Sequence, residues 1–313
     1  MRVFVAGATG VIGRFLVPQL RAAGHEPIAM TRSEERAERL RGSGVEAVAA
    51  DALDRERVVQ AVRDARPDAV VHQLTAIPHR LNPRNVDRDF ELTNRLRTEG
   101  TRNLLDAARE AGAERLVAQS VAFIYEPDGG WVKSEDDPMY SRAPKRFTET
   151  AAALKELERL VLDAGGTVLR YGLFYGPGTT YAADGAVAGL VRARRFPVVG
   201  SGEGRLSFIH VEDAARATVA AVERGRPGPL NVVDDEPAVA GDWLREYASL
   251  LGAKPPRKVP VWMARLAAGE YGVVMMTRMR GASNERAKQE LDWEPMRRSW
   301  REGFRAEIAG SAA

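Results

Sequence analysis

The 313-residue chain contains no cysteine, which excludes disulfide bonds, a cysteine nucleophile and thiolate metal ligands. No run of 18 apolar residues could span a membrane, and residues 2–7 predict a strand instead of a signal peptide. Lysine and arginine form no run suited to nucleic acid, and the net charge is only +3. We therefore expect a small-molecule substrate, no nucleic-acid or membrane partner, no metal site and, since the chain suits a reducing compartment, a cytoplasmic location.

Short apolar runs alternate with longer amphipathic segments through most of the chain. The expected strands are apolar almost throughout, as strands buried on both faces are: Arg2–Ala6, Glu26–Met30, Val45–Ala49, Ala69–His72, Arg115–Gln119, Thr167–Arg170 and Leu230–Val233. The expected helices include Val11–Ala23, Glu34–Arg41, Asp54–Asp64, Asn94–Ala111 and Thr148–Asp163. This order predicts an α/β fold, a Rossmann-type doubly wound parallel sheet.

The regular alternation weakens after Tyr171, where glycine, proline and irregular spacing become more frequent. We expect a dinucleotide-binding Rossmann domain formed by residues 1–174 and 208–235. Residues 175–207 and 236–313 would then form a smaller C-terminal substrate-binding lobe.

A glycine-rich loop lies between the first expected strand and the first expected helix. Glycines permit a tight turn and a close approach of the backbone to a pyrophosphate, while the helix N-terminus supplies free N–H groups. The position of the loop, after a strand and before a helix, supports this interpretation over a merely structural turn. The predicted phosphate contacts are Gly7, Thr9, Gly10, Val11, Ile12 and Gly13.

The second expected strand is followed by Thr31-Arg32-Ser33. A site that prefers NAD usually carries an acidic residue here, which binds the ribose 2′-hydroxyl. A guanidinium and two hydroxyls instead suit a 2′-phosphate. The sequence therefore favours NADP(H) over NAD(H), although Arg32 could also be an ordinary exposed arginine ahead of a charged helix.

Further segments match one family in the correct order. They are Asp51-Ala52, Leu74-Thr75-Ala76, Asn94 with Gly100-Thr101, Arg170 with Tyr175-Gly176-Pro177-Gly178, Phe208-Ile209-His210-Val211-Glu212-Asp213, Asn231-Val232 and a terminal group at Ser283-Asn284, Ala287-Lys288, Glu290-Leu291, Trp293 and Pro295. Over nearly its whole length, the chain resembles an extended short-chain dehydrogenase/reductase of the NAD-dependent epimerase/dehydratase family. The resemblance implies a nicotinamide dinucleotide cofactor and, because many relatives pair through two helices, a homodimer.

The resemblance also implies further cofactor contacts. Asp51-Ala52 resembles the pair that holds the adenine, and Leu74-Thr75-Ala76 resembles the loop that passes under the cofactor. The complete set that it adds to the glycine loop is Asp51, Ala52, Leu74, Thr75, Ala76, Asn94, Ser120 and Tyr171.

The catalytic positions depart from the family pattern. Relatives that reduce or oxidise a carbonyl use a Tyr-x-x-x-Lys pair on one helix face, together with a Ser or Thr after the fifth strand. When the helix is aligned on Glu158, Thr150 occupies the tyrosine position and Leu154 the lysine position. When the strand is aligned on Tyr125, Val121 occupies the Ser/Thr position. We therefore predict an atypical member without the usual triad.

Proton transfer would then need another group. The candidates are Tyr140, Ser120, Tyr125, Lys145 and Lys155, with a water molecule or a group on the substrate as alternatives. Lys155 is one residue late for the family position, which turns it about 100° around the helix. If Tyr140 is the donor, its replacement by phenylalanine reduces turnover at least tenfold.

The expected lobe offers material for a substrate pocket. Met275, Met276 and Met279, with Trp262 and Tyr271, would form either an adaptable apolar wall or simply the core of the lobe. Arg205 would either bind an anionic substrate group or lie in solvent.

The favoured function is an NADP(H)-dependent oxidoreductase that transfers hydride to or from a small organic substrate. Reduction of carbon–carbon or carbon–nitrogen double bonds needs less help from a phenol than carbonyl reduction does. One alternative is an NAD-dependent sugar-nucleotide epimerase/dehydratase, which requires the Tyr/Lys pair. The other is a catalytically silent NADP(H)-binding sensor or scaffold, which the altered triad favours and the aromatic and methionine content of the lobe disfavours.

Overall fold

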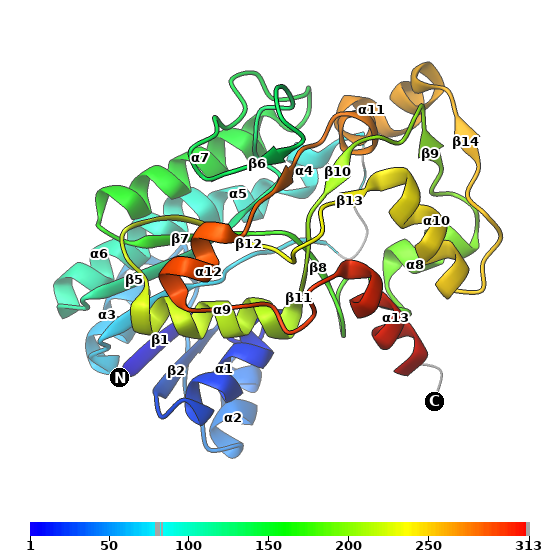
Figure 1. Ribbon diagram of the computed structural model, residues 1–313. Coiled ribbons are helices and arrows are strands. Elements are labelled where there is room, and N and C mark those ends of the chain that lie inside the picture. Colours follow the sequence, from blue (N-terminus) through cyan, green and yellow to red (C-terminus); the bar gives the residue numbers. More distant parts are fainter. Residues whose placement is uncertain (79–81, 83, 311–313) are drawn as a thin grey trace.

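The centre of the protein is a seven-stranded parallel sheet with the strand order β12-β7-β5-β4-β1-β2-β3 (Figure 1). The structure, a computed structural model, describes residues 1–78, 82 and 84–310. The strands are β1 (Arg2–Ala6), β2 (Glu26–Thr31), β3 (Glu46–Ala49), β4 (Ala69–His72), β5 (Arg115–Val121), β7 (Thr167–Tyr171) and β12 (Gly228–Val232). The predicted Rossmann-type doubly wound sheet is confirmed.

All seven expected strands are present in this sheet. β1 and β4 have the predicted bounds, and β5 continues two residues further than predicted, to Val121. Every residue of β4 is buried, because helices cover both faces of the sheet. The apolar runs were therefore a reliable signal for these central strands.

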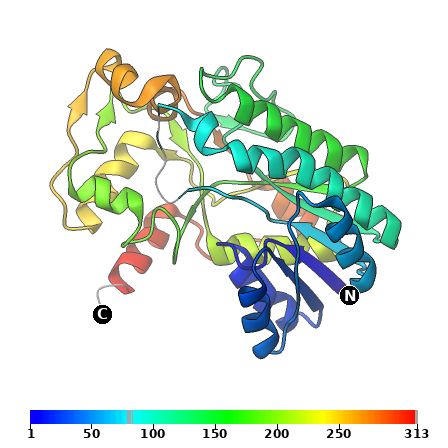
Figure 2. The same ribbon diagram turned by 180° about the vertical axis from the view of Figure 1, so that it is seen from behind.

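Helices cover the sheet in two layers (Figures 1 and 2). On one face, side chains of the sheet pack with those of α1 (Gly13–Ala22), α2 (Glu34–Gly42), α9 (Val211–Arg224) and α12 (Glu285–Leu291). On the other face lie α3 (Arg55–Ala65), α6 (Thr101–Ala111) and α7 (Thr148–Asp163). Of the expected helices, Thr148–Asp163 has the predicted bounds.

The segment predicted as one helix from Asn94 to Ala111 changes its hydrogen-bonding pattern twice. It consists of α5 (Glu91–Arg95), a π-helix η1 (Leu96–Gly100) and α6. The hydroxyl of Thr101 donates to the carbonyls of Arg97 at 2.7 Å and Leu96 at 3.5 Å, and such side-chain bonds compete with the regular helical pattern. A π-turn inside a helix changes which side chains face the sheet and is frequent at functional sites.

A second hydrophobic cluster lies beyond the carboxyl ends of the strands. It is centred on aromatic side chains that include Trp243, Phe208 and Phe304. The remaining elements are α4 (Val86–Asp89), β6 (Val132–Lys133), β8 (Leu173–Tyr175), α8 (Ala186–Arg192), β9 (Val198–Val199), β10 (Arg205–Leu206), β11 (Phe208–His210), β13 (Ala238–Val239), α10 (Ala240–Leu250), β14 (Lys258–Val259), α11 (Val261–Thr277), β15 (Gly281–Ala282) and α13 (Trp300–Gly310). The division into two domains stays a prediction. Within residues 1–78, 82 and 84–310, none of the helices combines the length and apolar character that crossing a bilayer requires.

The strand order reverses between β1 and β4. The chain runs from β1 to β2 and β3 on one side, and β4 then pairs with the opposite edge of β1. In open α/β sheets, ligands bind at such a point, outside the carboxyl ends of the strands. This edge of the sheet therefore positions the candidate site.

Candidate active site

The glycine loop has no room for side chains at its first and last glycines. Gly7 has φ +96°, and a Cβ built on it would lie 2.7 Å from the carbonyl oxygen of Gln73. A Cβ on Gly13 would lie 2.4 Å from the Gly7 oxygen and 2.5 Å from the carbonyl group of Ala8. Glycine is required at both positions because the loop packs against the end of β4 and against itself.

The loop ends at a helix N-terminus with free donors. Among the described residues, the N–H groups of Val11, Ile12 and Gly13 have no hydrogen-bond acceptor, and Ile12 provides no side-chain cap. Val11 and Gly10 are exposed. Three successive free N–H groups and the positive end of the α1 dipole suit a pyrophosphate. The residues present thus fit a dinucleotide, although the individual contacts remain predictions.

The predicted 2′-phosphate site lies at the end of β2. Thr31 is buried, whereas Arg32 is exposed and makes no ion pair or hydrogen bond with any described residue. The hydroxyl of Ser33 accepts a hydrogen bond from the Arg36 amide at 3.4 Å and so caps α2. The Arg32 guanidinium is therefore free to bind an anion beside this helix N-terminus.

The other predicted cofactor residues follow β3 and β4 at the same edge of the sheet. Asp51 accepts a hydrogen bond from the Leu53 amide at 3.0 Å, and the Ala52 carbonyl accepts one from Asn103 of α6 at 2.9 Å. After β4, the Ala76 amide donates to the Thr93 hydroxyl at 3.0 Å. These bonds fix both loops against the α5–α6 segment.

The loop after β4 also depends on a buried histidine. The Leu74 amide donates to Nδ1 of His72 at 3.2 Å, which leaves Nε2 to donate to the Thr101 hydroxyl at 3.1 Å. Burial lowers the pKa of His72 to about 4, so the ring is neutral at pH 7. The neutral tautomer therefore holds the predicted cofactor loop, Leu74 to Ala76, in place.

Stability should consequently fall in acid. Because the unfolded chain binds a proton near pH 6.5 and the folded chain only near pH 4, the free energy of unfolding drops as pH falls through this window, by about 3 kcal/mol for His72 alone. Urea titrations between pH 7 and pH 4 would measure this slope. His72→Gln should have a shallower slope, and equal slopes for the two proteins would contradict the assignment.

Ser120 and Tyr125 belong to a buried polar network. Ser120 donates to Oε1 of Glu158 at 2.6 Å, and Arg170 binds the same carboxylate with its shortest contact, Nη2 to Oε2, at 2.6 Å. Arg170 also donates to the Tyr125 hydroxyl at 2.9 Å, which in turn donates to Asn231 at 2.7 Å. Burial raises the pKa of Tyr125 to about 12. Both candidate hydroxyls thus already have buried protein partners.

Tyr171 lies in the same part of the sheet, at the end of β7. Its hydroxyl is buried, accepts a hydrogen bond from Gln73 at 3.1 Å and pairs with the Thr218 hydroxyl at 2.6 Å. Burial raises its pKa to about 12. Its predicted role in cofactor binding stays a prediction.

Apolar and hydrogen-bonded side chains occupy the positions that the sequence alignment predicts for the family's catalytic residues. Val121 and Leu154 are buried in one hydrophobic cluster. Thr150, in the first turn of α7, donates to Asp87 at 2.9 Å and accepts a hydrogen bond from Asn94 at 3.2 Å. The α7 segment Thr148–Asp163 contains no tyrosine.

Tyr140 joins the same hydrophobic cluster. Its side chain is buried, and its hydroxyl has no hydrogen-bond partner among the described residues. Burial raises its pKa above the ordinary value for tyrosine. Lys155 donates to the main-chain carbonyl of Tyr140 instead of the hydroxyl, and the Lys145 amide donates to Glu270 at 3.2 Å. The structure therefore brings no lysine ammonium to the Tyr140 hydroxyl.

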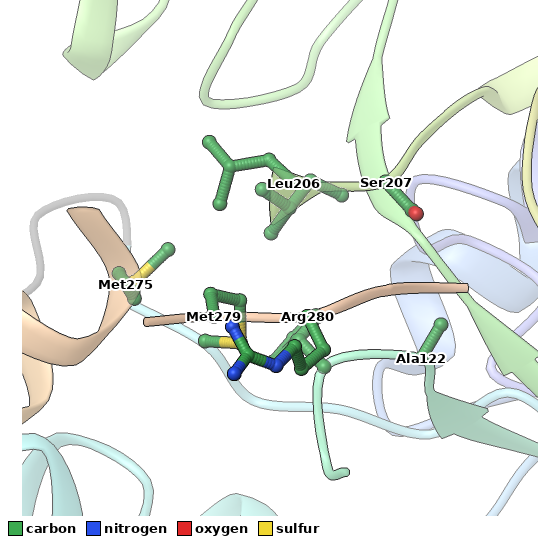
Figure 3. Close-up of a pocket in the computed structure, with 8 residues that line it drawn as sticks. Ala122, Leu206, Ser207, Met275, Met279 and Arg280 are labelled. Atoms are coloured by element: carbon green, nitrogen blue, oxygen red, sulfur yellow. The ribbon is translucent and has the colours of Figure 1, made fainter. Parts of the chain in front are cut away.

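A small pocket lies between the end of β5 and the second hydrophobic cluster (Figure 3). Figure 3 shows Leu206 on one side and Met279 with Arg280 on the other, while Met275 and Ala122 lie at the ends. The lining is mainly apolar and has one cationic side chain: Ala122, Phe123, Leu173, Leu206, Ser207, Met275, Met279 and Arg280. Two of the predicted wall methionines thus line a pocket.

The sequence analysis did not single out Arg280, which lines the pocket, or Arg97 in η1. Arg280 lies 4.1 Å from the Trp131 ring centre, on which Arg205 also packs at 5.1 Å. Arg97 is buried in η1 and bonds to Asn94 at 3.2 Å. The spacing of Asn94 and Arg97 places them on one helix face, a signal that was present in the sequence.

Comparison with known proteins assigns the family. The sequence model of the NAD dependent epimerase/dehydratase family matches residues 3–233. The chain belongs to this family. The resemblance seen in the motifs is thereby confirmed, and the chain is an oxidoreductase of the extended short-chain dehydrogenase/reductase type.

Relatives with assigned activities include reductases. A Streptomyces sp protein named 3-diazoavenalumate denitrifying reductase is 51% identical over 97% of this chain and 99% of its own length. The dTDP-4-dehydro-6-deoxy-D-allose reductase of Streptomyces bikiniensis is 28% identical over 94% of this chain and 91% of its own. The solved UDP-glucose 4-epimerase of Thermotoga maritima has the same fold, with a TM-score of 0.78, 21% identity and coverage of 100% and 99%.

Proposed function

We propose that this protein is an NADP(H)-dependent reductase that replaces the nitrogen of an aryl diazo compound by hydrogen. The observation that carries the proposal is the apolar cluster at the catalytic positions, where Val121 and Leu154 pack together and Thr150 stands in place of tyrosine. A carbonyl reduction would lack its proton donor at this site. The similarity to the Streptomyces diazo reductase supplies a reaction that needs none.

The electron balance explains why no donor is needed. The glycine loop would hold NADPH, which would supply the hydride. In an aryl diazonium substrate, a C–H bond replaces the C–N bond, and N₂ leaves with the bonding electron pair, so that the products are the arene, N₂ and NADP⁺. A ketone instead becomes an alkoxide that requires a proton, which relatives provide from tyrosine.

The apolar surroundings serve this chemistry. A hydrophobic site excludes water, which would otherwise compete as a nucleophile for a diazonium carbon. Met275, Met279 and Phe123 offer polarisable and aromatic surface against a planar ring. The protein therefore acts mainly by binding, orienting and excluding water.

Preference for NADP(H) rests on Arg32. Its guanidinium is exposed and unpaired among the described residues, beside the N-terminus of α2. A 2′-phosphate would receive a charge-assisted hydrogen bond there, which a 2′-hydroxyl would not.

Replacing Arg32 with alanine should weaken NADPH binding by roughly 10- to 100-fold, which corresponds to the loss of one hydrogen bond to a charged group. NADH binding should change less than about twofold. Calorimetric titration of both cofactors measures the difference. Arg39→Ala, in the adjacent helix α2 and paired with Glu35 at 2.5 Å, is the control. Equal losses for both cofactors would contradict a phosphate contact.

Replacing Tyr140 with phenylalanine should leave turnover unchanged and raise the free energy of unfolding by about 1 kcal/mol, because it removes a buried hydroxyl without a partner. Steady-state kinetics and urea unfolding measure the two effects. A tenfold loss of turnover would instead identify Tyr140 as a proton donor.

The direct test is NADPH oxidation with 3-diazoavenalumate, followed by absorbance and by N₂ release. We expect one N₂ for each NADPH, and no oxidation with dTDP-4-dehydro sugars, which need a proton donor. Turnover of the sugar substrates alone would favour the epimerase/dehydratase alternative. Binding of NADPH without turnover of any of these compounds would favour a silent scaffold.

A further inference from the structure

Arg97 is a buried arginine without a carboxylate. The residue is only 4% exposed, and among the described residues the guanidinium makes one hydrogen bond, from Nη1 to the side-chain oxygen of Asn94 at 3.2 Å. No acidic side chain in the described ranges, 1–78, 82 and 84–310, forms an ion pair with it. Buried charges in proteins are ordinarily paired, since an unpaired one is costly.

Arg170 shows what a structural arginine looks like in this fold. It is equally buried, at 4% exposure, but binds both oxygens of Glu158 at 2.6–3.2 Å. Burial works to lower the pKa of Arg170, and the hydrogen bonds and charge of Glu158 outweigh it and raise the pKa. Burial lowers the pKa of Arg97 to about 10, because no carboxylate opposes it. Arg97 therefore lacks the partner that its burial calls for.

The guanidinium of Arg97 lies beside the hydrophobic cluster that contains Val121 and Leu154. The guanidinium lies 5.6 Å from the ring centre of Phe90, which shares a helix face with Asn94. Phe90 packs with Phe147 and with Tyr271 of α11 in this one hydrophobic cluster. Tyr271 stacks on Phe147 with ring centres 4.2 Å apart. The charge thus lies at an aromatic junction of η1, α7 and α11.

Hydrogen bonds link Arg97 to Thr150, which stands at the predicted position of the family's tyrosine. Asn94, which receives the Arg97 hydrogen bond, itself donates to Thr150 at the position of the family's tyrosine. Thr93, its neighbour in α5, holds the Ala76 amide of the predicted cofactor loop. One short helical segment therefore positions both the cofactor loop and the unpaired guanidinium.

We propose that Arg97 binds the carboxylate of the substrate and thereby orients it for reduction. The inference rests on the proposed function and specifies its substrate class: a planar aromatic or conjugated acid. A guanidinium binds a carboxylate in bidentate geometry, and the neighbouring rings accept the flat body of such a molecule. The name of the diazo compound reduced by the Streptomyces relative ends in -ate, the form of an acid anion.

The test compares an acid with its neutral ester on the NADP⁺-loaded protein. The probes are avenalumate, in which hydrogen replaces the diazo group, and its methyl ester, titrated by calorimetry. Arg97→Met should weaken binding of the acid at least 30-fold, leave the ester within threefold and leave NADPH affinity within twofold. Arg97→Lys should recover part of the acid affinity. Arg95→Met is the matched control, since Arg95 lies on the surface and pairs with Glu99 at 2.9 Å.

Thermal unfolding separates binding from a structural role. Because Arg97 is unpaired without substrate, Arg97→Met should keep or raise the Tm of the ligand-free protein. A lower Tm, together with equal losses for acid and ester, would overturn the proposal, as would failure of the wild-type protein to bind the acid.

The two proposals fail in different ways. Binding of avenalumate that depends on Arg97, without N₂ release from 3-diazoavenalumate, would refute the reductase reaction alone. Equal N₂ release from the diazo acid and its methyl ester, in both wild-type and Arg97→Met protein, would refute the role of Arg97 alone.

Discussion

Replacing Glu158 with alanine should lower the free energy of unfolding by about 3–5 kcal/mol, because it leaves the Arg170 guanidinium buried without a counter-charge. Arg170 makes three hydrogen bonds to Glu158, and Ser120 donates a fourth at 2.6 Å. Each group is almost fully shielded from water. Water cannot reach Arg170 to replace the lost carboxylate. Nearly the whole free-energy cost of burying the Arg170 charge therefore remains uncompensated.

Urea unfolding of three variants isolates this effect. Ser120→Ala should cost only about 1–2 kcal/mol, since Glu158 keeps its arginine. The double variant Glu158→Leu with Arg170→Met removes both charges and should recover most of the stability. A Glu158→Ala protein within about 1 kcal/mol of the wild type would show that solvent or another carboxylate reaches Arg170, contrary to the buried network.

Replacing Gly13 with alanine should abolish cofactor binding. The added Cβ would lie 2.4 Å from the Gly7 oxygen and 2.5 Å from the carbonyl of Ala8, so the loop must move. The N–H groups of Val11 and Ile12 would move with it. Because these donors replace the hydration of a doubly charged pyrophosphate, we expect NADPH affinity to fall at least about 100-fold, or roughly 3 kcal/mol.

Gly42→Ala provides the control for this change. A Cβ at Gly42, at the end of α2, meets no atom within 4 Å. That variant should bind NADPH as the wild type does. Unchanged NADPH affinity in Gly13→Ala, measured by calorimetry on protein of normal Tm, would contradict the placement of the pyrophosphate.

Local sequence patterns predicted the strands of the sheet well. β1 and β4 are short apolar runs whose neighbours along the chain mark both ends, so pattern alone determines their bounds. The glycine loop was likewise readable, because Gly7 and Gly13 are required by contacts within the loop and with the adjacent strand. Counting back along the helix from Glu158 predicted that Leu154 stands at the position of the family's catalytic lysine.

Features that depend on distant contacts were not predictable from local patterns. Ser120 is one residue from the family's catalytic position, and only the folded chain shows it donating to Glu158. The π-turn of η1 depends on where the Thr101 hydroxyl finds carbonyl partners. The burial of Arg97, likewise, is apparent only in the folded chain.

The predicted absence of a tyrosine–lysine pair agrees with the packing at these positions. Val121 and Leu154 fill the positions with apolar volume, while Thr150 is tied to Asp87 and Asn94. Such a site stabilises no developing alkoxide, but it suits a substrate whose leaving group carries away the electron pair. Reduction of a diazo compound meets this requirement.

The most direct measurement is the origin of the new hydrogen in the product. NADPH deuterated at the transferring C4 position is supplied with 3-diazoavenalumate in ordinary water, and the product is examined by NMR. We predict one deuterium at the carbon that carried the diazo group and one N₂ per NADPH. Incorporation from the solvent, seen as deuterium in the product when unlabelled NADPH is used in D₂O, would contradict hydride transfer without a protein proton donor.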